Sequence, residues 1–215
     1  MSKTSAYKDM EKQLDLVKKI TNRVDPNVCS NVTDVLKVNS YVLLSHAAFE
    51  KYLENLVEII MTKSVLNYSS TNGVKVNKCI ISMLSKKVVS CYENAASLSK
   101  TKKKEAINKE MREVSLNTSD KLGDAQRLVL SILRRNHGIK IDNMNTIFNC
   151  IGVYPEEIDV SLCSDLDSFG ASRGGVAHVV QIQQVISKSQ AIANVKNIKG
   201  KLLAFERSVM TYMNF

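Results

Sequence analysis

Apolar residues recur at three- and four-residue steps along most of the chain, which is the spacing of one face of an α-helix. The pattern predicts a first helix over residues 5–23, and Pro26 ends it. A second helix begins at Asn31 or Asn39, and its stripe consists of Val42, His46, Phe49, Leu53, Leu56 and Ile60. The same spacing predicts a long last helix reaching almost to Phe215, with a stripe of Val195, Ile198, Leu202, Phe205, Val209 and Tyr212. Further helices are predicted over residues 78–97, 101–114, 120–135 and 142–151.

Few residues that interrupt helices separate these segments. The chain of 215 residues has only two prolines and eight glycines, so signals for short strands and tight hairpins are scarce. Residues 67–78 are predicted to form a loop, and residues 74–76 could form a short strand, which leaves one small inserted hairpin open. No internal repeat or linker divides the sequence. We therefore expect an all-α fold, an up-and-down helical bundle in which residues 1–215 form a single domain.

The cysteines and the termini limit the class of protein. Five widely spaced cysteines never form a Cys-x-x-Cys pair, so neither a disulfide framework nor a zinc site is expected. The polar start of the sequence lacks the apolar core of a secretory signal, and no segment approaches the roughly 18 apolar residues of a membrane span. We expect a soluble, cytoplasmic protein with no membrane partner.

The formal net charge of +9 favours an anionic partner such as RNA or DNA, although a solvated basic surface would explain it equally well. The same two interpretations apply to the run Lys102–Lys104 and to Arg134 and Arg135. There is no tryptophan, the seven tyrosines are dispersed, and no aromatic residues interleave with the lysine run. Base-stacking platforms of the RRM or OB kind are therefore not expected. Walker loops, dinucleotide fingerprints and nucleophile elbows are also absent.

The strongest candidate for chemistry is the segment 168–178, in which Arg173 and His178 are separated by four residues. We expect a break at Gly170–Gly175 followed by the start of the last long helix. Gly174 and Gly175 would then let a phosphate approach the backbone, where free N–H groups of the helix start favour an anion. An Arg can bind two phosphate oxygens, and a His can transfer protons near neutral pH without a metal or another cofactor. The alternative is a core histidine beside a capping arginine.

This segment resembles the signature of the HEPN superfamily, an Arg and a His four to six residues apart at the start of the last long helix of a small bundle. Residues 41–53, Tyr-Val-Leu-Leu-Ser-His-Ala-Ala-Phe-Glu-Lys-Tyr-Leu, look like the early core helix of its RiboL-PSP-like branch. Residues 147–153, Ile-Phe-Asn-Cys-Ile-Gly-Val, are similar to the region of that branch that precedes the motif. The resemblance spans most of the chain and implies a HEPN-type bundle with extra helices.

The resemblance also implies an activity, namely metal-independent cleavage of single-stranded RNA in the cleft of a homodimer. Arg173 would bind the scissile phosphate, and His178 would transfer the proton while the 2′-hydroxyl attacks and leaves a cyclic phosphate. Many relatives act in toxin–antitoxin or antiphage systems, so an antitoxin or defence protein is the implied partner.

Other features keep different functions open. The family often has Asn, Asp or His directly after the Arg, whereas Gly174 stands there in this chain. A catalytically silent HEPN protein that binds RNA or a partner protein therefore stays an alternative, as does a helical interaction scaffold. His46 and Glu50 share a helix face and could support the site as a hydrogen-bonded pair. The simpler interpretation is a satisfied core histidine and a boundary carboxylate.

Overall fold

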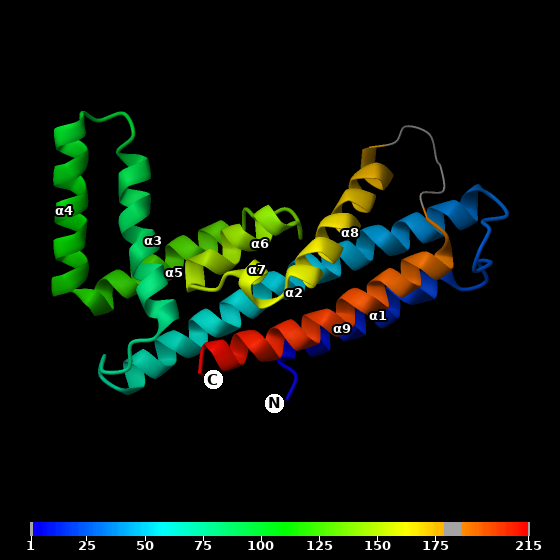
Figure 1. Ribbon diagram of the computed structural model, residues 1–215, viewed down its shortest axis with the longest axis horizontal. Coiled ribbons are helices and arrows are strands. Elements are labelled where there is room, and N and C mark those ends of the chain that lie inside the picture. The colour runs from blue at the N-terminus through cyan, green and yellow to red at the C-terminus, as the bar shows by residue number, and fades with distance from the viewer. Residues whose placement is uncertain (1, 179–185, 215) are drawn as a thin grey trace. The chain divides into compact units, whose positions relative to one another are not determined.

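The computed structural model describes residues 2–178 and 186–214, apart from the side chains of residues 174–178. All regular structure within these ranges is helical, which confirms the all-α prediction (Figure 1). Residues 74–76 form no strand, so the described residues contain no small β-hairpin. None of the described helices is both long and apolar enough to cross a membrane.

The helices follow the predicted segments closely. Nine α-helices and two short 3₁₀ helices occupy the described ranges: α1 Ser5–Lys18, η1 Lys19–Thr21, α2 Val32–Ser70, α3 Lys78–Asn94, α4 Lys100–Leu116, α5 Thr118–Leu133, α6 Ile141–Phe148, η2 Asn149–Ile151, α7 Pro155–Ile158, α8 Val160–His178 and α9 Lys188–Tyr212. The helix α2 is longer than predicted because it continues through Asn67 to Ser70. A turn with Asn72 and Gly73 at positive φ then leads towards α3.

The chain forms two compact units. Unit 1 comprises residues 1–56, 137–144 and 155–215, and unit 2 comprises residues 57–136 and 145–154. Both α2 and α6 run across a boundary between these ranges without an interruption of the helix.

Unit 1 is held together by contacts among α1, α2 and α9. Near the start of α1, the Tyr7 hydroxyl donates to the Lys199 carbonyl at 2.9 Å, and the ring of Tyr7 meets that of Tyr52 edge-on at 5.8 Å. Beyond the end of α1, the Lys188 ammonium donates to the Val24 carbonyl at 2.8 Å. These pairs show that α1 and α9 run antiparallel, as Figure 1 displays.

A buried carboxylate joins the same three helices. Glu206 of α9 is 2% exposed and accepts hydrogen bonds from the Thr4 amide at 3.0 Å, the Thr4 hydroxyl at 2.6 Å and the Tyr52 hydroxyl at 3.2 Å. A buried carboxylate costs little free energy only when such donors surround it. The position of α9 in unit 1 therefore depends on this polar cluster as well as on apolar packing.

Unit 2 is built around α3, which packs against α4, α5 and η2. Its buried residues include Ile80, Met83, Ala125, Val129 and Ile151. In contrast, α4 contributes no buried residue.

The predicted break at Gly170–Gly175 is wrong, because α8 continues through these glycines from Val160 to His178. Glycine costs a helix interior only about 1 kcal/mol relative to alanine, and tertiary packing readily offsets that amount. The last long helix begins instead at Lys188, where Ser187 and Gln190 form a capping box.

Candidate functional site

An aromatic contact in unit 1 holds α8 against α2. The rings of Phe49 and Phe169 meet at 70° with their centroids 5.7 Å apart, and both side chains are buried. Arg173 follows Phe169 by four residues on α8, so the two side chains lie on the same face of that helix. Arg173 is exposed. The packing of Phe169 thus places an exposed guanidinium beside α2.

His46 and Glu50 stand one turn apart on the part of α2 that carries Phe49. The Nδ1 atom of His46 lies 3.6 Å from a carboxylate oxygen of Glu50, and the side chains are 3% and 21% exposed. Burial, together with the charge of Arg173, lowers the pKa of His46 to about 4. The imidazole is therefore neutral at pH 7, and its contact with Glu50 is not an ion pair under those conditions.

The charge of Arg173 acts on both of these residues. Burial raises the pKa of the Glu50 carboxyl, and the neighbouring Glu54 raises it further, whereas the positive charges of Arg173 and His137 lower it. Each of these shifts requires the interacting groups to be near one another. The charge of Arg173 thus reaches both His46 and Glu50, and that of His137 also reaches Glu50.

The turn before α6 carries His137 to this place. The amide of Ile141 donates to Asp167 of α8 at 2.7 Å. The side chain of Lys140 passes so close to Gly170 that a Cβ atom there would lie 3.0 Å from Lys140 Cγ. Since Gly170 precedes Arg173 by three residues, Lys140 also lies along this face of α8.

Sequence reasoning missed both His137 and Lys140 as members of the site. Both side chains are exposed, and more than thirty positions separate them from Arg173 in the sequence. Neither forms a motif with it, so no pattern signalled their proximity. Together with Arg173 they supply three groups that can carry positive charge and attract an anion.

The other motif residues lie in the last described part of α8. Gly174, Gly175 and His178 are helical, and the side chains of these three residues lie outside the described residues. The prediction that Arg173 and His178 flank the start of a helix is therefore wrong. Only the first turn of a helix has free N–H groups, and α8 begins at Val160, so an anion at Arg173 must be bound by side chains.

The family described as RiboL-PSP-HEPN matches residues 6–211, which is nearly the whole chain. The chain belongs to this family. Its helices accordingly form an all-α bundle of the HEPN type. HEPN domains are generally related to nucleases and RNA, and they often bind RNA and form dimers. No curated protein and no solved structure matches this HEPN chain.

The cysteines of this HEPN protein are free thiols. Cys79, Cys150 and Cys163 are buried, and Cys29 and Cys91 are half-buried. Within residues 2–178 and 186–214, no group of three or more His, Cys, Asp or Glu side chains is placed to hold a metal ion.

Proposed function

We propose that this HEPN protein is a metal-independent endoribonuclease that cuts single-stranded RNA with Arg173 and His178. The observation that carries the proposal is the position of Arg173, an exposed residue whose charge acts, with that of His137, on the half-buried carboxylate of Glu50. Lys140 lies beside Gly170, one turn before Arg173 on α8. Such a group of donors suits a phosphodiester, which has two anionic oxygens for a guanidinium to bind.

In the proposed reaction, Arg173 binds the scissile phosphate and offsets the charge that develops on its oxygens. The 2′-oxygen of the preceding ribose attacks the phosphorus and loses its proton, while the bond from phosphorus to the 5′-oxygen breaks and that oxygen gains a proton. His178 transfers the proton. The products are a 2′,3′-cyclic phosphate and a free 5′-hydroxyl, and the reaction needs no oxidant or cofactor.

Glu50 has a positioning role in this scheme. Its carboxylate interacts electrostatically with Arg173 and can orient the guanidinium, while the neutral His46 lies 3.6 Å from the same carboxylate. Buried at 3% exposure, His46 is a packing and orienting residue rather than a group that meets RNA.

The active form is proposed to be a homodimer in which two Arg–His pairs face one cleft, and its cellular setting a toxin–antitoxin or antiphage system. A dimer should have a mass twice the 24.0 kDa of one chain when light scattering is measured during gel filtration. A monomer that cuts RNA at full rate would contradict the paired cleft.

Cleavage itself can be tested with end-labelled single-stranded RNA in excess EDTA. The wild type should cut, and both His178→Ala and Arg173→Ala should lower the rate by about 10²- to 10⁴-fold, the usual contribution of a positioned proton-transfer or charge-stabilising group. The matched control is Arg207→Ala, which removes an exposed arginine from α9 and should leave the rate unchanged.

The products and the controls separate the alternatives. A cyclic phosphate at the new 3′ end identifies attack by the 2′-hydroxyl. If the wild-type protein shifts RNA on a gel without cutting it, the protein is an RNA-binding protein and not a ribonuclease. The presence of Gly174 after the Arg, where the family often has Asn, Asp or His, is the reason for this alternative. Protein that neither binds nor cuts RNA would favour a helical scaffold.

A further inference from the structure

The outer side of α4 in unit 2 carries five exposed cations. We refer to them as the basic face: Lys100, Lys102, Lys104, Lys109 and Arg112. Within α4, which the structure describes in full, Glu105 is the one exposed acidic residue. None of the five cations forms an ion pair with any carboxylate of the described residues.

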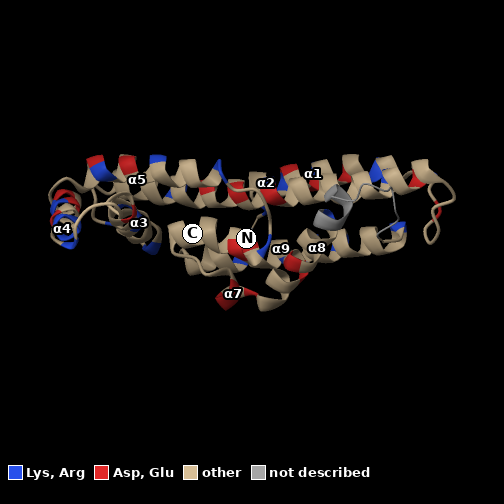
Figure 2. Cartoon of the chain, turned by 90° about the horizontal axis from the view of Figure 1, so that it is seen from above, with Lys and Arg blue, Asp and Glu red and all other residues tan. Residues whose placement is uncertain are grey.

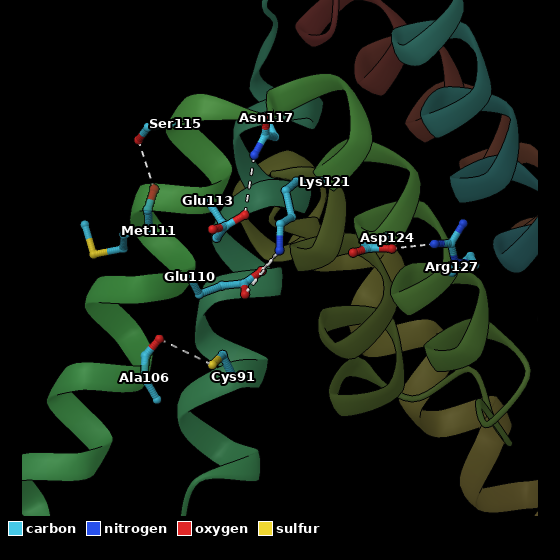
Figure 3. A network of polar contacts seen from close by, with 10 residues as sticks. All are labelled: Cys91, Ala106, Glu110, Met111, Glu113, Ser115, Asn117, Lys121, Asp124 and Arg127. Carbon is cyan, nitrogen blue, oxygen red and sulfur yellow. Dashed lines mark hydrogen bonds and ion pairs between the residues drawn. The ribbon is translucent and has the colours of Figure 1, made fainter.

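The remaining acids of α4 are occupied by contacts with α5 and its N-cap. The Lys121 ammonium lies 3.4 Å from Glu110, and the Asn117 amide donates to Glu113 at 3.4 Å (Figure 3). Elsewhere in the protein, Lys and Arg are interspersed with Asp and Glu along the helices (Figure 2). On α4, Glu110 and Glu113 are half-buried, and Glu105 is the one acidic residue exposed among the five cations of the basic face.

Folding does not account for Lys100, Lys102 and Lys104 of the basic face. Lys100 and Lys102 lie in the first turn of α4, which contains no acidic residue, and there a positive charge opposes the helix dipole. Lys100 and Lys104 are also like charges four residues apart, an arrangement that destabilises a helix. A bound polyanion would offset both the unfavourable interaction with the helix dipole and the repulsion between these lysines.

An aromatic ring lies beside Lys103, the half-buried lysine of α4 that is next to Lys102 and Lys104 in the sequence. Tyr92 of α3 is 51% exposed, and the Lys103 ammonium lies 5.7 Å from the centre of its ring. The sequence shows no aromatic residue among these lysines, but the pairing of α3 with α4 supplies one. The Sγ atom of Cys91, the neighbour of Tyr92, donates to the Ala106 carbonyl at 3.8 Å, which helps to hold the two helices together (Figure 3).

We propose that the basic face binds the backbone of single-stranded RNA and that Tyr92 stacks on one of its bases. This inference rests on the proposed function, for which RNA is the substrate, and it assigns a binding surface outside the candidate active site. From Lys100 to Arg112 the helix rises about 18 Å at 1.5 Å per residue. That length matches about five nucleotides of a stacked strand at 3.4 Å each.

The test compares two triple variants that lower the net charge equally. Lys100→Gln/Lys102→Gln/Lys104→Gln removes half of the cations of α4, and the control Lys8→Gln/Lys19→Gln/Lys75→Gln removes three exposed lysines elsewhere. Binding is measured by fluorescence anisotropy between about 50 and about 200 mM salt. The probe is a labelled RNA of about 20 nucleotides with every 2′-hydroxyl methylated, so that it can bind but cannot be cut.

The α4 variant should bind about tenfold more weakly than the wild type at the lower salt concentration. Its slope of log affinity against log salt should fall by about 2, since each lost phosphate contact on a single strand contributes about 0.7. The control should change affinity less than about twofold and keep its slope. Equal effects of the two variants, or no binding by the wild type, would overturn the inference.

Tyr92 gives a second measurement that a general charge effect would not change. Tyr92→Ala should weaken binding at least about fivefold even at the higher salt concentration, because base stacking is lost, whereas Tyr92→Phe should retain wild-type affinity. Wild-type affinity in Tyr92→Ala would remove the stacking role.

These outcomes are independent of cleavage. A protein that cuts RNA while its α4 variant binds like the control would keep the proposed function and lose this surface. If the protein never cuts RNA, but its α4 variant loses the salt-dependent binding, the binding surface is supported and the proposed ribonuclease function is contradicted.

Discussion

His46 shows how one buried side chain couples stability to pH. The folded protein holds the pKa of His46 at about 4, below the ordinary value of 6.5, mainly through burial and also through Arg173. The unfolded chain therefore binds more protons than the folded chain between these values. The contribution of His46 to the free energy of unfolding is therefore fully present above pH 6.5 and is lost as the pH falls towards 4.

We predict that the wild type loses about 2 kcal/mol through this residue between about pH 7 and about pH 4.5. His46→Gln should lack that loss. Urea denaturation followed by circular dichroism at both pH values measures the difference between the two proteins. Glu50 acts in the opposite direction, because its raised pKa lets the folded state bind a proton first on acidification, but both proteins contain it. If the unfolding free energies of the wild type and His46→Gln change with pH in parallel, the pKa of His46 is not lowered in the folded protein.

At the scale of the helices, two glycines should respond to the same substitution with opposite signs. Gly200 lies inside α9 with no atom within 4 Å of an added Cβ, so Gly200→Ala should stabilise the protein by about 0.5–1 kcal/mol through helix propensity alone. Gly152 ends η2 at φ +74°, and an added Cβ would lie 3.2 Å from the Lys78 carbonyl oxygen and press on Ser82. Gly152→Ala should destabilise by about 1–3 kcal/mol.

Midpoints of urea unfolding measure both changes. A neutral Gly152→Ala would mean that the turn after η2 can change its backbone conformation without cost. A destabilising Gly200→Ala would mean that α9 meets another surface at this position, for example that of a second copy of the chain.

The glycines of α8 explain why one helix boundary was predicted wrongly. A cluster of Gly170, Gly174 and Gly175 is typical of a loop, because glycine is the residue that most often ends helices and forms turns. In the fold, Phe169 is buried against Phe49, and the Ile141 amide bonds to Asp167, so contacts from two other segments hold α8 in place. Tertiary contacts can therefore offset the weak local preference of these glycines.

At the scale of the whole molecule, we propose that residues 1–215 form one domain although they include two compact units. The family match runs over residues 6–211 and thus includes both units. The helix α2 passes from Leu56 in unit 1 to Val57 in unit 2 without interruption. Loss of either unit would therefore leave part of this long helix without its packing partners.

The expected result is one cooperative unfolding transition. In hydrogen exchange at increasing urea, the most protected amides of α5 in unit 2 and of α9 in unit 1 should converge on one free energy of opening. Two distinct opening free energies that persist at high urea would show instead that the units unfold independently.

The sequence alone was enough to predict the helical class, nearly all helix positions and most members of the buried stripes, although Tyr212 of the last stripe is 37% exposed. Val42, His46, Phe49 and Leu53 are buried as their spacing predicted, because helical periodicity is a local property that burial of one face requires. The pair His46 and Glu50 was also predictable, since residues four apart on a helix are neighbours.

Which distant groups share a surface depends on tertiary contacts that the sequence did not reveal. His137 and Lys140 join Arg173 because packing and one hydrogen bond place the turn before α6 on α8, and Tyr92 joins the lysines of α4 because α3 packs beside it. Such encounters depend on how helices pack rather than on the spacing of residues within one helix. Periodicity therefore predicted the elements of this protein, while the candidate active site and the basic face with its tyrosine were completed by contacts between elements.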